Sequence, residues 1–131
     1  MDLIRAIGTK LGYKVEISSM GFDALIPALN SGNIDVAIAG MSITDERKKV
    51  VVFSDPYYTS GLIVMVKKDD DTIKGFSDLE GKRIAVQIGT TGANKAGEVK
   101  NAKVTAFNDN TAAAMELKNG GADAVINDSP V

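Results

Sequence analysis

The sequence predicts an α/β protein in which helices flank sheets of mostly parallel strands. Two observations support this prediction. Apolar runs typical of buried strands alternate along the chain with segments of helical spacing. In addition, residues 29–38 (LNSGNIDVAI) align without gaps to residues 117–126 (LKNGGADAVI), and each copy has a helix end, a glycine turn, an Asp and a buried strand. Such units recur in many α/β proteins, so the repeat fits either this general class or two similar lobes that face one another.

The first half of the chain is predicted to form helices and strands in alternation. Leu3, Ile7 and Leu11 have helical spacing, and Gly12 follows where a C-cap is expected. Alternating apolar residues favour a strand after this helix, and a continuous apolar run favours a later strand covered on both faces. The expected order is a helix over residues 3–11, a strand over residues 13–17, a helix over residues 23–30 and a strand over residues 36–39.

The second half repeats this alternation with more elements. Four apolar runs separated by turn residues predict strands, and two further segments predict helices, the second of which ends at Gly120 and Gly121. The strands are expected at residues 62–66, 83–87, 103–107 and 122–126, and the helices at residues 92–99 and 111–119.

The composition excludes several classes of function. The 131 residues include 15 Lys and Arg and 17 Asp and Glu without a basic stripe, so no nucleic-acid partner is expected. The chain has no Cys and no His, which removes thiol nucleophiles, the usual zinc ligands and the commonest general base, and no metal or cofactor is predicted. Its apolar runs are shorter than a membrane span and its first residues lack a signal-peptide core, so the chain as given is expected to be soluble.

Polar loops follow both copies of the repeat. The first copy runs into Gly40-Met-Ser and the second into Asn127-Asp-Ser. Because open α/β sheets bind ligands beyond the carboxyl ends of their strands, both loops are expected at a binding site. Gly40 lets the backbone approach a ligand closely, and Ser42 offers a hydroxyl group.

Arg47 is the strongest candidate for a charged contact. Thr44 is placed to cap a short helix, and Arg47 follows one turn later. The planar guanidinium of Arg47 could take a carboxylate in two parallel hydrogen bonds. The alternative is a surface ion pair between Arg47 and Asp45 or Asp55.

The second half carries two features that complement a carboxylate site. The turn from Gln87 to Gly92 (QIGTTG) lies between a strand and a helix, where backbone amides favour anions. Asp128 lies just past an apolar strand end, where its carboxylate could receive an ammonium group, although Asp-Ser-Pro also makes an ordinary turn. With Arg47 holding a carboxylate, Asp128 would complete an α-amino-acid site.

These residues lie in segments that resemble a known family. The sequence is similar to the polar amino-acid-binding proteins of bacterial ABC importers, which have the type II periplasmic solute-binding fold (family 3). The matching segments cover nearly the whole chain in the family's order: FDALIPALNSGNIDVAIAGMSITDERKKVVVFSDPYY, LIVMVKK, FSDLEGKRIAVQIGTTG and ELKNGGADAVINDSPV.

The resemblance implies roles for individual residues. Phe22 would stack on the ligand, Arg47 would hold the α-carboxylate together with the glycine and serine of the first loop and Thr91, and Asp128 would hold the α-ammonium. Gln87 would reach toward the ligand side chain. The predicted ligand-binding residues are Phe22, Gly40, Met41, Ser42, Arg47, Gln87, Thr90, Thr91 and Asp128, and no catalytic residue is predicted.

The resemblance also divides the chain. Residues 1–58 would form a first lobe without its initial strand, residues 59–61 a hinge, residues 62–126 a nearly complete second lobe and residues 127–131 a truncated return hinge. A parallel sheet that lacks its central strand leaves unpaired backbone and exposed apolar faces. The chain would therefore be a fragment, or would complete its sheet by oligomerisation or strand swapping with a second copy through residues 62–66 or 36–38.

The function that this resemblance implies is binding of a polar or basic L-α-amino acid between two lobes, for delivery to a membrane ABC permease. Gln87 favours a polar or cationic side chain, so glutamine, arginine, lysine and histidine remain open. The implied location is the periplasm, or the cell exterior with a lipid anchor. The alternatives are a fragment that binds weakly or not at all, a dehydratase-type enzyme, and a sensory domain on the same scaffold.

Overall fold

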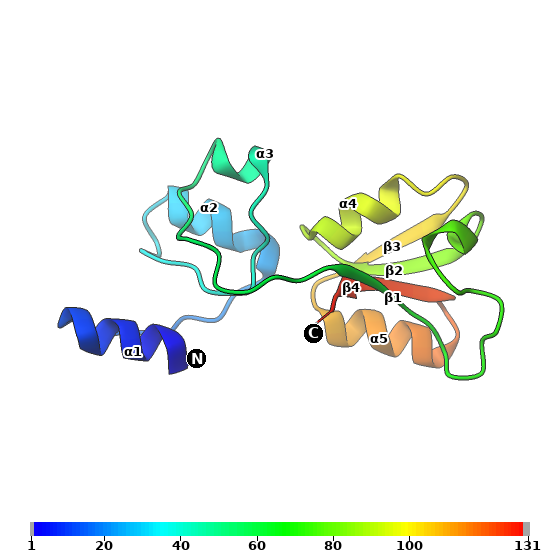
Figure 1. Cartoon of the computed structure of the whole chain (residues 1–131), viewed down its shortest axis with the longest axis horizontal. Helices are drawn as coiled ribbons and strands as arrows, with labels where there is room; N and C mark the ends of the chain where they lie inside the picture. Colours follow the sequence, from blue (N-terminus) through cyan, green and yellow to red (C-terminus); the bar gives the residue numbers. More distant parts are fainter. Residues whose placement is uncertain (1, 130–131) are drawn as a thin grey trace.

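The computed structural model describes residues 2–129, which form two parts joined by an extended connection (Figure 1). Residues 62–129 contain all the described strands and are called the sheet part here. Residues 2–58 contain helices and irregular segments and are called the helical part. The connection leads directly into the first strand of the sheet part.

The sheet part contains a four-stranded sheet in the order β1-β4-β2-β3. β2 runs parallel to both β3 and β4, whereas β1 pairs antiparallel with β4, so the sheet is mixed and mostly parallel as predicted. The strands are β1 (Leu62–Met65), β2 (Arg83–Gln87), β3 (Lys103–Phe107) and β4 (Ala124–Asp128). The sequence placed the last strand two residues too early, because the ladder with β1 extends β4 to the pair Leu62–Asp128.

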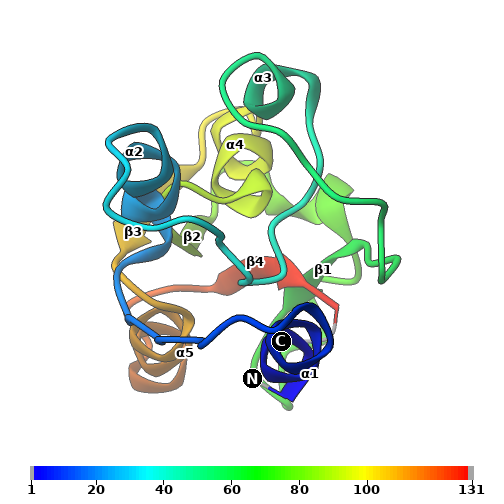
Figure 2. The ribbon, with the colours of Figure 1, turned by 90° about the vertical axis from the view of Figure 1, so that its left-hand side faces the viewer.

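Two helices cover opposite faces of this sheet, α4 (Thr91–Gly97) and α5 (Asn110–Asn119) (Figure 2). Side chains alternate along β2, so Ile84 and Val86 pack with Ala96 of α4, whereas Ala85 packs with Leu117 of α5. A short 3₁₀ helix, η2 (Phe76–Leu79), adds its buried final leucine to the α4 side. The two layers of core residues fix the sheet between its helices.

Both helices have well-defined ends. The Thr90 side chain accepts a hydrogen bond from the Ala93 amide at the start of α4, and Asp109 does the same for Ala112 in α5. Gly120 ends α5 with φ of 85°, a left-handed conformation that favours glycine. Strand ends and helix starts are thereby held at one edge of the sheet, where the candidate site lies.

The parallel register of β2 and β4 is reinforced by an ion pair between Arg83 and Asp123. The Asp123 carboxylate accepts hydrogen bonds from the backbone amide and the guanidinium of Arg83, and the Asp123 amide donates to the Arg83 carbonyl. Hydrogen bonding to Arg83 holds the pKa of Asp123 below its usual value. The stabilisation is therefore present above the pKa of the unfolded carboxylate, about 3.9, and is lost as the pH falls through the lower pKa of the folded state.

We expect Asp123→Asn to lower the free energy of unfolding of the sheet part by about 1 kcal/mol at pH 7, because the pair is only partly shielded from water. Urea unfolding followed by circular dichroism would measure the difference, which should shrink below pH 4 as the wild-type carboxylate becomes protonated. The control is Asp45→Asn, which removes an exposed pair with Lys48. A difference that stays constant with pH would contradict the role assigned to the ion pair.

The helical part consists of short helices and irregular chain. Its elements are α1 (Asp2–Leu11), η1 (Phe22–Ala24), α2 (Leu25–Asn30) and α3 (Asp45–Lys48). The predicted helix at residues 3–11 and its end at Gly12, where φ is 77°, are confirmed. The predicted helix at residues 23–30 is also confirmed, although its first turn is 3₁₀.

The two strands predicted in the helical part are wrong for this chain. Residues 13–17 and 36–39 are extended or bent but belong to no ladder in the described structure. An apolar run forms a strand only when a neighbouring strand pairs with its backbone, and residues 2–58 contain no ladder that could provide one. The consequence is visible at Val36, predicted to be buried on both faces, which is 62% exposed.

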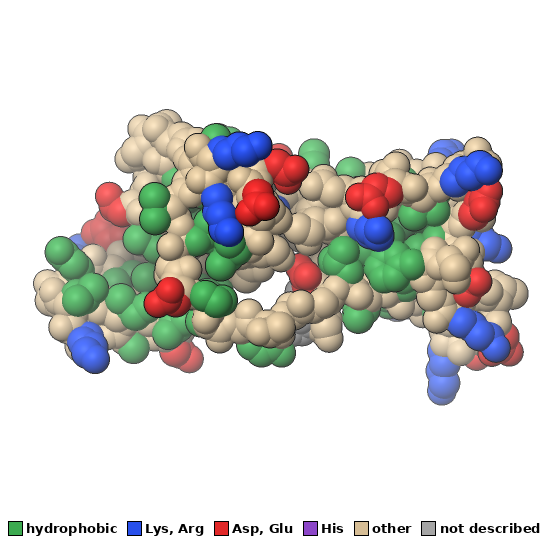
Figure 3. Space-filling model, turned by 45° about the horizontal axis from the view of Figure 1, so that its top comes forward, with side chains coloured by type: hydrophobic (Ala, Val, Ile, Leu, Met, Phe, Trp, Pro, Cys, Tyr) green, Lys and Arg blue, Asp and Glu red, His purple; other side chains and the backbone are tan. Residues whose placement is uncertain are grey.

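Apolar side chains consequently remain exposed over the helical part (Figure 3). Leu11 of α1 is 63% exposed and Val52 is 98% exposed, and among the apolar side chains described for residues 2–58 only Leu25 and Ala28 of α2 are buried. The exposed apolar faces expected from an incomplete first sheet are therefore present. Pairing of a second copy with β1, which is an edge strand, stays a prediction.

Candidate functional site

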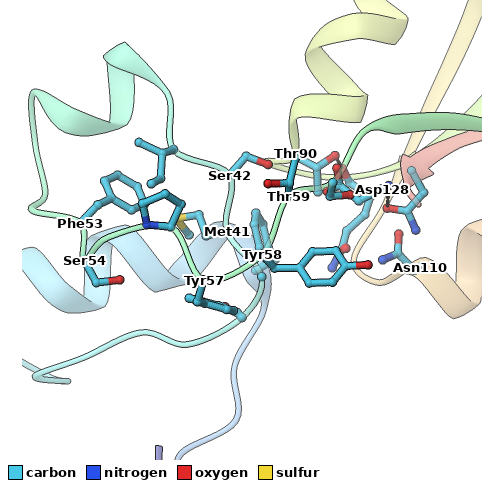
Figure 4. Close-up of a pocket in the computed structure, with 18 of the residues that line it drawn as sticks. Met41, Ser42, Phe53, Ser54, Tyr57, Tyr58, Thr59, Thr90, Asn110 and Asp128 are labelled. Carbon is cyan, nitrogen blue, oxygen red and sulfur yellow. Dashed lines mark hydrogen bonds between the residues drawn. The ribbon is translucent and has the colours of Figure 1, made fainter. Parts of the chain in front are cut away.

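A cavity of about 540 Å³ lies between the two parts (Figure 4). The loop after residue 39, the connection between the parts, and the ends of β2 and β4 all contribute to its wall. The cavity therefore lies beyond the carboxyl ends of two neighbouring parallel strands, where open α/β sheets bind ligands.

Most of the sequence-predicted site residues meet at this cavity, and two do not line it. Those that line it are Phe22, Gly40, Met41, Ser42, Gln87, Thr90 and Asp128. Thr91 is the first residue of α4 and lies outside the lining. Arg47 lies just behind the wall that Ser42 forms.

Arg47 is held by local structure and by a contact between the two parts. The Thr44 side chain accepts a hydrogen bond from the Arg47 amide, which begins α3 as the sequence predicted. Its guanidinium donates to the Ser42 carbonyl at 2.8 Å and, across the boundary, to the Gly89 carbonyl at 2.9 Å. The recorded ion pairs of the described chain do not include the alternative partners Asp45 and Asp55.

The surroundings of Arg47 suit a partly buried charge. The guanidinium lies 5.7 Å from the centre of the Phe22 ring, a cation–π distance. Burial lowers the pKa of Arg47 from its ordinary value, whereas the negative charges of Asp128 and Glu46 act in the opposite direction. An arginine remains charged under these conditions, so Arg47 and Asp128 place opposite charges beside one cavity.

The turn after β2 is shaped by its backbone. Thr90 is buried, and its hydroxyl donates to the Gln87 carbonyl while it accepts from the Ala93 amide, so this side chain holds the turn in place. Gly89 has φ of 76°, and a Cβ there would lie 3.1 Å from the Cβ of Asp23 in the helical part. The turn is thus in close contact with both Asp23 and Arg47.

Several cavity residues were not among those predicted from the sequence. Tyr57 and Tyr58, from the connection between the parts, both line the cavity, and Tyr58 points toward Asn110 (Figure 4). Asn110 and Asn127 also line it. The rule that ligands lie beyond strand ends would have indicated Asn110, because β3 ends three residues earlier.

Residues 2–129 show neither a metal-binding cluster nor a membrane-spanning helix. They contain no group of three or more side chains arranged to hold a metal ion. None of their helices combines the length and the apolar character needed to cross a membrane.

Comparison with known proteins identifies the class to which this fold and cavity belong. The chain matches the family of bacterial extracellular solute-binding proteins, family 3, over residues 1–129, and it belongs to this family. It is 43% identical over 127 residues to a probable histidine-binding protein of Campylobacter jejuni and 38% identical over 135 residues to the ABC transporter arginine-binding protein 1 of Escherichia coli. These alignments cover 97% and 100% of the chain but 50% and 54% of the relatives, so the chain spans about half their length.

Solved structures agree with this assignment. The arginine-bound form of a truncated ArgBP from T. maritima is 50% identical, with a TM-score of 0.94, over 98% of this chain and 61% of that one. An ancestral arginine-binding protein bound to arginine is 51% identical, with a TM-score of 0.94, over 97% of this chain and 57% of that one. The type II periplasmic-binding-protein fold predicted from the sequence is therefore confirmed.

Proposed function

We propose that this protein binds a polar or basic L-α-amino acid between two lobes and delivers it to an ABC importer. The proposal includes residues 59–61 as the hinge, the permease as the membrane partner, and a location outside the cytoplasmic membrane. The names of the relatives support this class of ligand, since they include histidine- and arginine-binding proteins.

The observation that carries the proposal is the position of two opposite charges at one cavity. Asp128 lines it from the end of β4, and Arg47 lies behind Ser42 in the facing loop, so the charges come from different parts of the chain. An α-amino acid carries a carboxylate and an ammonium on one carbon and would place each beside its opposite. Phe22 and Tyr58 supply apolar area on which the rest of the ligand can pack.

Titration calorimetry of the 131-residue chain with L-arginine, L-histidine, L-glutamine and L-lysine tests the proposal. We expect at least one of them to bind, and a thermal-shift series should show the same ligand raising the apparent melting temperature. L-Leucine serves as a control without a polar side chain. If none of the amino acids binds, the proposed function is overturned for this chain.

Chemical conversion of the ligand is the second candidate function. It is favoured by one structural relative, an ancestral amino-acid-binding protein described as a precursor of cyclohexadienyl dehydratase. That relative is 47% identical to this chain, with a TM-score of 0.94. We propose binding without conversion, since the relatives that are named for a function are binding proteins. Chromatography of the bound ligand after prolonged incubation distinguishes the two, because only an enzyme would change it.

A further inference from the structure

The turn after β2 touches the helical part at a single glycine. The Gly89 carbonyl accepts the hydrogen bond from Arg47 at 2.9 Å. On its other side Gly89 lies against Asp23 of η1, since a Cβ built on Gly89 would lie 3.1 Å from the Cβ and 3.2 Å from the Cα of Asp23. Two separate segments of the helical part therefore meet at Gly89.

Gly89 has no room for a side chain on the face that it turns toward Asp23. Carbon atoms pack at about 3.5–4.0 Å, so both of these distances are too short for an ordinary contact. The atoms that a Cβ would meet belong to the backbone of Asp23 or are attached directly to it, so rotation of the Asp23 side chain cannot move them away. The close approach of the two parts therefore requires a glycine at this position.

The backbone on each side of the contact is held by its own hydrogen bonds. The Ile88 amide donates to the Phe107 carbonyl of β3 at 2.9 Å, which ties the turn to the sheet. The Ala24 amide donates to the Gly21 carbonyl at 3.0 Å, which closes the turn of η1. Because both segments are held in this way, a side chain at residue 89 would push the two parts away from one another.

The contact adjoins the cavity on both sides. Phe22 directly precedes Asp23, and Thr90 directly follows Gly89, and both Phe22 and Thr90 line the cavity. Asp23 and Gly89 themselves are not among the lining residues. A shift at the contact would thus move one wall of the cavity relative to the other, although neither residue of the contact reaches a ligand.

Resting on the proposed function, we infer that Gly89 is a positioning residue for ligand binding: its contact with Asp23 sets the spacing of the two cavity walls. The measured affinity of a ligand falls with the fraction of molecules that have the binding-competent arrangement. A Cβ at residue 89 lowers this fraction because it holds the walls apart. The carboxylate of Asp23 has no part in this role, since the backbone and the Cβ of Asp23 make the contact.

The first test compares Gly89→Asn with Gly81→Asn. The two glycines have φ of 76° and 71°, and asparagine tolerates such values better than most residues, so the backbone strain is similar and small. Gly81 lies beyond the opposite end of β2, where a Cβ would meet nothing within 4 Å. Urea unfolding should therefore give similar midpoints for the two variants.

Affinity should separate these variants. The probe is whichever of L-arginine, L-histidine, L-glutamine and L-lysine binds the wild type most tightly in calorimetry. We expect Gly89→Asn to weaken its binding by at least about fivefold, the lower end of typical couplings between distinct sites, and Gly81→Asn to bind it like wild type. Asp23→Ala keeps the Cβ and should also bind like wild type.

The second test traps the contact directly. The chain has no Cys, so Asp23→Cys combined with Gly89→Cys introduces two thiols into a thiol-free protein. The Cβ atoms of a disulfide lie about 3.5–4.5 Å apart, close to the spacing found here. We expect an intramolecular disulfide, detected by intact mass and loss of free thiols, that forms faster when the same amino acid is bound. Asp23→Cys with Gly81→Cys is the control and should keep both thiols.

The outcomes separate this inference from the function on which it rests. If the wild type binds an amino acid and Gly89→Asn binds it equally well, or if the Asn variants of both glycines lose the same affinity, the role of Gly89 is refuted and amino-acid binding stands. Absence of the disulfide, or a rate of formation that bound amino acid does not raise, also refutes this role. A wild type that binds no amino acid overturns the proposed function for this chain, and the role of Gly89 with it.

Discussion

Replacement of Arg47 by Ala is expected to weaken binding of any α-amino acid by at least about tenfold, because the ligand carboxylate would lose its charged partner in a partly buried site. The same change also removes the hydrogen bonds to Ser42 and Gly89, so part of the loss would arise from looser contact between the two parts. Titration calorimetry with the amino acid that binds the wild type most tightly measures the total effect.

Arg47→Lys separates the two contributions. Lysine keeps the charge but cannot reach two carbonyls and a carboxylate with one planar group, so we expect an intermediate affinity. Lys48→Ala, in the same short helix with an exposed side chain, is the matched control and should leave binding unchanged. Wild-type affinity in Arg47→Ala would remove Arg47 from the site.

Replacement of Asp128 by Asn is expected to reduce affinity by about 100-fold, because the ligand ammonium would be buried beside a neutral amide. The Asp128 side chain is half-buried at the end of β4, and its backbone pairs with Leu62 of β1. The substitution preserves shape and backbone pairing, so the loss should appear in calorimetry without a change in the unfolding transition.

Asp55→Asn is the control for Asp128, since Asp55 also lines the cavity but is exposed. Screening by water should limit its effect on affinity to a few-fold. Equal losses in the two variants would mean that the cavity attracts cations through its overall charge and that Asp128 makes no specific contact with the ammonium.

The sequence predictions were accurate where the chain contains all the strands and helices that pack together, and inaccurate where it does not. β2 and β3 were predicted to the residue, since both strands have partners and covering helices within the chain. Residues 13–17 and 36–39 have apolar patterns that are equally clear, but no ladder forms there. A sequence pattern reports which face a strand would bury, whereas the strand itself depends on a neighbour that lies elsewhere.

The predictions for the site show a similar limit. The loop after residue 39 and Asp128 were recognised because each follows an apolar run directly. The hydrogen bond from Arg47 to Gly89 joins residues 42 positions apart and depends on how the two parts approach, which no local pattern encodes. Asn110 was missed because no apolar run stands directly before it, although it follows the end of β3 by three residues and lines the cavity at the start of α5.

The contact between Arg47 and Gly89 has a thermodynamic consequence. One guanidinium both holds the helical part to the turn after β2 and lies where a ligand carboxylate is proposed to bind. A ligand carboxylate that neutralises this cation changes the equilibrium between parts in contact and parts separated. By reciprocity, contact between the two parts changes the affinity for the ligand by the same factor. A ligand that lacks a carboxylate could occupy the cavity without changing the equilibrium between contacting and separated parts. Occupancy of the cavity and contact between the parts could then be measured separately.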